Sequence, residues 1–123
     1  MSTPRAITLA TIDHETVRLA EPSWCVGHAE HVPCHLVDLS HTGPEHTFAF
    51  AGSTLLVAML TQDPFATDPD RCQVGLYVEQ TGYAATLDFA GIRQYAAALT
   101  VHAMHLRTLA DELAAINAGE AGR

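Results

Sequence analysis

The sequence predicts an α+β fold: an antiparallel sheet of about five strands, a zinc-stapled loop and one long C-terminal helix. Three observations support this class. The chain has short β-prone apolar runs, a histidine- and cysteine-rich segment at 22–46 without a regular period, and a terminal stretch with apolar spacings of 3 and 4. With 123 residues, of which 48% are hydrophobic, we expect one packed domain over 1–123.

The strands are predicted from runs of apolar and β-branched residues bounded by turn residues. RAITLATI and ETVRLA are separated by Asp13 and His14, which predicts a hairpin. HTFAFAG predicts a further strand. STLLVAMLTQ, around 54–61, fits either a strand or a short buried helix, because periodicity does not separate the two. CQVGLYVEQ and YAATLDF, joined around Thr81 and Gly82, predict a second hairpin.

The C-terminal segment predicts an amphipathic helix over about 89–117. Asp88 is the expected N-cap, and Gly119 is the expected stop. At ~1.5 Å per residue the helix is about 40 Å long, so we expect part of its apolar stripe to pack against a second copy in a homodimer. The stripe consists of Ile92, Tyr95, Leu99, His102, Leu106, Leu109, Leu113 and Ile116.

The segment 22–46 carries two short-spaced pairs of metal-binding side chains. Cys25 and His28 form a C-x2-H pair, and His41 and His46 form an H-x4-H pair. Structural zinc takes four Cys or His ligands, usually as two such pairs joined by a longer segment, and mixed thiolate and imidazole ligands suit it. Because the loop is otherwise unsupported, the sequence predicts that Zn2+ holds it closed.

Other side chains in the segment leave the ligand set open. His31, Cys34 and His35 lie between the two pairs, and Cys34 is the main rival for the fourth position, since thiolate binds zinc tightly. Four protein ligands make a closed structural site, whereas three leave a position for water and permit catalysis. The catalytic alternative is disfavoured because neither an H-E-x-x-H helix nor the zinc deaminase signature occurs.

Two further features of the sequence have simpler explanations. His102 and His105 lie three residues apart on the predicted helix and are able to share a ligand. We favour a satisfied histidine on the apolar stripe for His102 and a solvated flank for His105. Cys72 opens a predicted strand and is interpreted as a small core residue.

Composition excludes several classes of function. Fourteen acidic residues against six basic ones, all arginine, give a net charge of −8. This balance disfavours direct binding to nucleic acid or to an anionic membrane. The absence of a signal-like apolar region and of a membrane-length apolar run predicts a cytoplasmic protein. Three cysteines beside histidines fit metal binding or free thiols better than disulfides.

The motifs PSWCVGH at 22–28 and LSHTGPEH at 39–46, with QDPFA, YVEQTGYA and the terminal helix, resemble a family of small uncharacterised actinobacterial proteins common in Streptomyces. The resemblance covers most of the chain. It implies that Cys25, His28, His41 and His46 occupy recurring positions, and that Cys34 and His35 are particular to this sequence. It implies no activity.

The sequence therefore predicts a non-enzymatic zinc-binding domain whose structural zinc stabilises a protein-interaction module, for example one with a regulatory role. The ligands are Cys25, His28, His41 and His46. One alternative is a zinc-dependent hydrolase with a three-ligand site. Another is a small-molecule binder that uses the space between sheet and helix.

Overall fold

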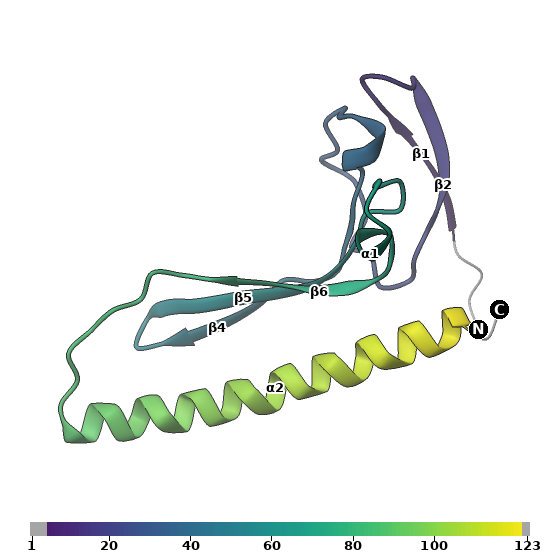
Figure 1. The fold of residues 1–123 in the computed structure, drawn as a ribbon. Helices are drawn as coiled ribbons and strands as arrows, with labels where there is room; N and C mark the ends of the chain where they lie inside the picture. The colour runs from purple at the N-terminus through teal and green to yellow at the C-terminus, as the bar shows by residue number, and fades with distance from the viewer. Residues whose placement is uncertain (1–4, 122–123) are drawn as a thin grey trace. The chain divides into compact units, whose positions relative to one another are not determined.

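The fold is taken from a computed structural model, which describes residues 5–121. The fold class is α+β, as predicted, and the chain ends in a long helix (Figure 1). In chain order the elements are β1 (Arg5–Ala10), β2 (Thr16–Glu21), the 3-10 helix η1 (Leu36–Asp38), β3 (His41–Thr42), β4 (His46–Phe50), β5 (Ser53–Gln62), α1 (Pro69–Cys72), β6 (Gly75–Gln80) and α2 (Phe89–Ala121).

Six strands lie within residues 5–121, and they form two sheets rather than one sheet of about five strands. β1 and β2 make a two-stranded antiparallel sheet. The second sheet has the order β3-β5-β4, and β6 also pairs with β5. The difference arises because the long segment 22–40 separates β2 from the strands that follow.

The chain divides into two compact units, each described here by itself. The first unit contains the residues up to 44 together with 59–75, and the second contains 45–58 together with the residues from 76 onward. β5 contributes to both, since the division falls between Ala58 and Met59. The single domain over 1–123 stays a prediction.

The first unit is built on the predicted hairpin of β1 and β2, whose register runs from Arg5 opposite Glu21 to Ala10 opposite Thr16. The turn is closed by Thr11, whose hydroxyl donates to the Glu15 carbonyl oxygen at 2.9 Å and accepts from the His14 N–H at 2.8 Å. Glu15 takes the positive φ of 56° that glycine commonly supplies in such turns, and the Thr11 hydroxyl holds its carbonyl in place.

The segment after β2 is irregular, as expected, but it is fastened to the hairpin. The Ile12 N–H donates to the Cys34 carbonyl oxygen at 2.8 Å, and the Leu36 N–H donates to Asp13 Oδ1 at 2.9 Å. This second bond is the main reason why the pKa of Asp13 is lowered. The segment therefore has its own protein contacts besides any metal.

The second unit contains the hairpin of β4 and β5. Residues 54–61 are strand, which resolves the alternative left open by the sequence. Ala51 and Gly52 both have positive φ, at 50° and 82°, and form the tight two-residue turn between the strands. The core of this unit consists of Phe48, Ala58 and Leu109, with Leu56, Leu76 and Leu106 packed against it.

The predicted second hairpin is wrong. β6 forms from Gly75 onward, whereas Cys72, predicted to open this strand, ends the short helix α1 and is only partly buried. Residues 81–88 are not a strand, and β6 pairs with β5 instead. Tyr83 stacks on Tyr95 of α2 and meets Phe50 of β4 edge-on, with ring centroids 5.9 and 6.2 Å apart. The aromatic side chain of this segment thus packs against the helix and β4 rather than taking part in a strand ladder.

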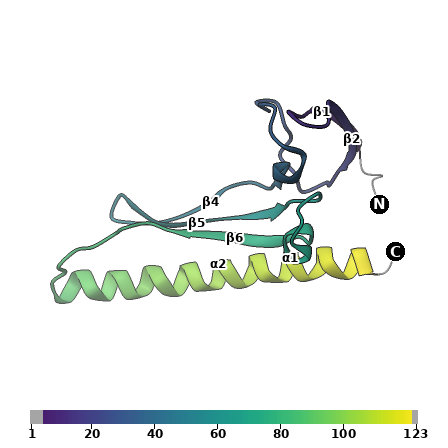
Figure 2. The same ribbon diagram turned by 45° about the horizontal axis from the view of Figure 1, so that its top comes forward.

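The C-terminal helix α2 is confirmed and is longer than predicted (Figure 2). It contains 33 residues, which is about 50 Å of helix. Gly119 does not stop it, because a glycine lowers helix stability by only about 1 kcal/mol and is tolerated in a final turn. Within residues 5–121, no helix combines the length and apolar character needed to cross a membrane.

Several large apolar side chains of α2 face solvent: Phe89, Ile92, Leu99, Val101 and Met104. Such residues are common singly on protein surfaces. Here Ile92 and Leu99 belong to the apolar stripe, part of which was expected to pack against a second copy. The homodimer stays a prediction.

Asp88 caps α2 as predicted, since its Oδ1 accepts from the Gly91 N–H at 2.7 Å. We expect Asp88→Ala to lower the free energy of unfolding by about 1 kcal/mol, because this N–H loses its partner. Asp88→Asn should keep nearly all the stability, since an amide oxygen caps equally well. Urea denaturation followed by circular dichroism measures both. Equal losses in the two variants would show that the cap does not act through this hydrogen bond.

Candidate metal centre

Cys25, His28 and His41 come together in the first unit with their potential ligand atoms within 4.8 Å of one another. His28 Nε2 lies 3.6 Å from Cys25 Sγ and 3.3 Å from His41 Nδ1. Around tetrahedral zinc, bonds of about 2.3 Å to sulfur and about 2.05 Å to nitrogen place N and S about 3.6 Å apart and two N atoms about 3.3 Å apart. The two distances therefore match a zinc site.

His41 is held in place by the short strand β3. In the register of the sheet, His41 is opposite Gln62 and Thr42 is opposite Thr61. The Val26 N–H donates to the Thr42 carbonyl oxygen at 2.9 Å, which ties the Cys25–His28 segment to β3. This backbone contact brings together ligands that are 13 residues apart in the chain.

A glycine between Cys25 and His28 makes their approach possible. Gly27 has φ of 102°, a conformation that side chains with a Cβ rarely adopt. Its N–H points at Cys25 Sγ at 3.4 Å, as in many sites where backbone N–H groups face a thiolate. The C-x2-H spacing works here because Gly27 permits the turn.

Burial shifts the pKa values of His41 and Cys25 towards their neutral forms. His41 is only 2% exposed, and its pKa is lowered first by this burial and then by His28. The pKa of the Cys25 thiol is raised, mainly by burial. The site thus offers a neutral imidazole and a thiol that has to lose its proton before it binds a metal.

His46, the predicted fourth ligand, is not a member of the three-residue group found within residues 5–121. It lies on β4 opposite Ala58, and its ring meets that of His105 edge-on at 5.1 Å between centroids. Its ligation stays a prediction.

The three intervening residues have other contacts. His31 Nε2 donates to the Ala10 carbonyl oxygen at 2.8 Å, and His35 Nδ1 lies 3.8 Å from Asp13 Oδ2. The backbone of Cys34 bridges to Thr11 in a parallel pair. These contacts fasten the segment to the first hairpin. The choice between these residues and His46 as the fourth ligand stays a prediction.

The two histidines of α2 lie on the second unit. His102 Nε2 donates to the Ala49 carbonyl oxygen at 3.0 Å, and its ring meets Phe48 edge-on. This agrees with the prediction of a satisfied histidine on the apolar stripe. His105 is exposed and packs against His46 and Phe48.

Sequence reasoning missed Glu21, a buried carboxylate beside the centre. Only 6% of it is exposed, and its Oε1 has no hydrogen-bond partner. The Arg5 guanidinium binds Oε2 from Nε at 3.2 Å and Nη2 at 2.6 Å and holds the pKa of the carboxyl below its usual range. A signal was present: Glu21 shares the alternating face of Val17 and Leu19 on β2, where an acid is unexpected.

The fold and the site together define a small α+β protein with a Cys-His-His cluster able to hold a metal ion. The chain belongs to the DUF6907 family, a domain of unknown function that matches residues 6–115. No curated protein and no solved structure matches the chain. The resemblance to an uncharacterised family is confirmed to that extent, and the actinobacterial source stays a prediction.

Proposed function

We propose that the protein binds one zinc ion through Cys25, His28 and His41. The supporting observation is the pair of distances, 3.6 and 3.3 Å, which match the ligand spacing of tetrahedral zinc. A thiolate with two imidazoles favours zinc over the harder ions calcium and magnesium, which prefer oxygen.

In this proposal the ion has a structural effect on the segment 22–46. It links residues 25–28 to His41 and closes a loop that is otherwise held by short elements and a few hydrogen bonds. Closing such a loop costs conformational entropy, which metal binding offsets. The fold of the segment then depends on zinc.

The ordered segment is proposed to act in protein interaction. Three valines on it are exposed: Val26, Val32 and Val37, at 63%, 75% and 41%. A contiguous patch of exposed apolar side chains is typical of an interaction site, and in this proposal the three valines contribute to one. The net charge of −8 favours a protein partner over nucleic acid.

The proposal is tested by native mass spectrometry of the purified protein. We expect one zinc ion per 13.2 kDa chain. Cys25→Ser should lose the ion, because the hydroxyl is a far weaker zinc ligand than thiolate. Cys34→Ser is the matched control and should keep it. If the wild-type protein still carries no zinc after zinc has been added to it, the proposal is contradicted. If Cys34→Ser loses its zinc, Cys34 belongs to the coordination shell.

A zinc-dependent hydrolase is the second candidate. It is supported by the number of grouped ligands within residues 5–121, three rather than four, since catalytic zinc sites commonly keep one position open. The two candidates differ in the fourth coordination position of the zinc. A protein side chain occupies it in a closed structural site, and water or substrate occupies it in a catalytic site.

A further inference from the structure

We propose that the fourth position of the metal takes a small exogenous ligand that carries a proton on its coordinating oxygen, and that Glu21 Oε1 accepts the hydrogen bond from this ligand. The inference rests on the proposed zinc site and specifies what that site binds. Glu21 is a positioning residue in this arrangement and does not ligate the metal.

The first observation is the unpaired oxygen of Glu21. Its Oε2 is bound by Arg5, while Oε1 is buried without a partner. A buried acceptor left unpaired costs about 1–3 kcal/mol, and more when it is charged, so such groups usually have a partner in the functional state. Because a carboxylate only accepts, the missing partner is a donor.

The second observation is the place of this oxygen. Oε1 lies 3.8 Å from the position that a Cβ on Gly27 would take, and Gly27 separates the ligands Cys25 and His28. Glu21 also raises the pKa of Cys25, first by a side-chain hydrogen bond with the thiol and then by its charge, and its charge acts on His41 as well. The thiol contact is lost once Cys25 gives up its proton to bind a metal. The unpaired oxygen therefore lies beside the metal ligands.

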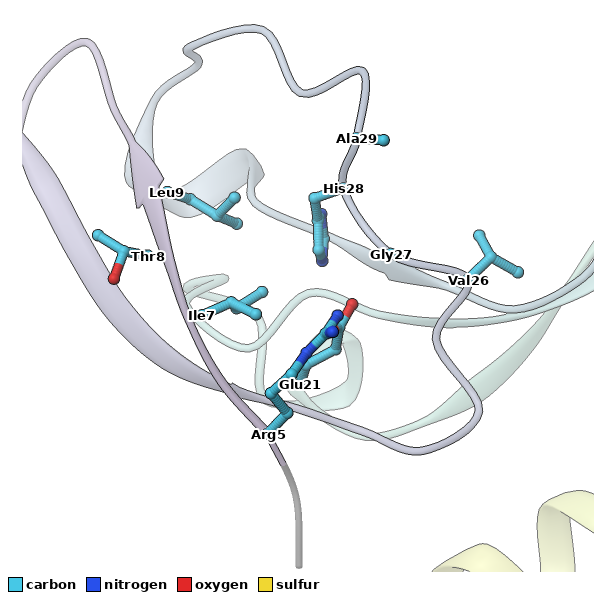
Figure 3. A pocket seen from close by; sticks show the side chains of 9 residues that line it. All are labelled: Arg5, Ile7, Thr8, Leu9, Glu21, Val26, Gly27, His28 and Ala29. Carbon is cyan, nitrogen blue, oxygen red and sulfur yellow. The ribbon is translucent and has the colours of Figure 1, made fainter.

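The third observation is an open pocket of about 490 Å³ on the same side of the site. In Figure 3 the side chains of Arg5 and Glu21 rise from the two strands of the hairpin towards the ring of His28. Ile7 and Leu9 point into the same space from β1. A ligand that reaches the metal through this pocket passes Glu21 Oε1 and meets an apolar wall.

These features define the ligand class. The coordinating group has to bring a proton to Oε1. Water does so through its O–H, and a hydroxamic acid does so by passing its hydroxyl proton to the carboxylate as its oxygen binds the metal, after which the two oxygens share that proton in a hydrogen bond. An aprotic anion such as thiocyanate brings a negative charge against an acceptor-only oxygen and is disfavoured. The pocket accepts a short apolar substituent on the ligand.

The test uses the full chain with cobalt(II) in place of zinc, whose visible absorption reports the ligands of the metal. We expect acetohydroxamic acid to change the spectrum of the wild-type protein with saturation, and thiocyanate to have little effect. Glu21→Gln should weaken acetohydroxamic acid by about tenfold, because a charge-assisted hydrogen bond is lost. The same variant should bind thiocyanate more tightly than wild type, since the amide nitrogen can donate to the anion.

The matched control is Glu30→Gln, an exposed acid on the same segment, which should behave as wild type. Cobalt affinity within about twofold of wild type shows that Glu21→Gln leaves the ligands intact. If the protein binds cobalt but its spectrum does not respond to acetohydroxamic acid, the inference is overturned while the metal site is retained. That result is expected if His46 or Cys34 completes the coordination shell. Loss of cobalt from Glu21→Gln would make Glu21 a ligand and also overturn it. A wild-type protein that binds no cobalt would reject the proposed metal site itself.

Discussion

Replacing His41 with alanine is expected to abolish the stabilisation that zinc gives the protein. Zinc at about a thousand times its Kd stabilises a folded state by about 4 kcal/mol if the unfolded chain does not bind it. For a chain of this length that corresponds to a shift in melting temperature on the order of 10 °C. In wild type, a chelator should remove this shift. In His41→Ala, zinc and chelator should give the same melting temperature in differential scanning calorimetry.

The informative quantity is the difference in melting temperature between the zinc-bound and the chelator-treated protein, because His41 is also buried. Only 2% of it is exposed, so the alanine variant loses packing as well as a ligand and will melt lower even without metal. His35→Ala is the control, since His35 is exposed and lies outside the three-residue group. It should keep the full response to zinc. A zinc response that survives in His41→Ala would remove His41 from the ligand set.

His46→Ala tests the prediction that His46 is the fourth ligand, again by comparing melting temperatures with zinc and with chelator. If His46 completes the shell, its variant should lose much of the zinc response. If the fourth position is open to exogenous ligands, the response should persist. The packing of His46 against His105 is a separate contribution, which lowers stability equally with and without zinc.

The site was partly predictable because two of its three residues are close together in the sequence. Cys25 and His28 are three residues apart, and the turn between them needs only Gly27. His41 was found by its residue type and spacing, but its position depends on β3 pairing with the end of β5, which no local pattern encodes. Glu21 was missed because an acid at the end of a strand normally faces solvent.

The fold was predictable where one periodic signal dominated. α2 follows from its apolar spacing, and the first hairpin follows from two alternating runs close in sequence. Prediction failed at 81–88, where a β-prone composition lost to packing of Tyr83 against Tyr95 and Phe50. The segment 54–61 stayed ambiguous because both a central strand and a buried helix present a continuous apolar run.

Phe48→Ala is expected to cause the largest loss of stability in the second unit. Phe48 is fully buried, and it contacts Ala58 of β5 and Leu109 of α2 in the core. Its ring also meets the rings of His102 and His105 at 5.1 Å between centroids. Removing a buried phenylalanine ring costs about 3–5 kcal/mol, because apolar contacts are lost and a cavity remains.

Such a loss is a large part of the 5–15 kcal/mol that typically stabilises a whole protein, so the unfolding midpoint of the variant should move to a much lower denaturant concentration. Guanidinium denaturation followed by circular dichroism at 222 nm, where the helix α2 dominates the signal, measures the change. Phe89→Ala is the matched control, because Phe89 is 75% exposed and its removal should alter stability by less than about 0.5 kcal/mol. If Phe48→Ala were no more destabilising than Phe89→Ala, α2 would not be held to the β4–β5 hairpin by this core, and the helix would have to be stabilised by another surface.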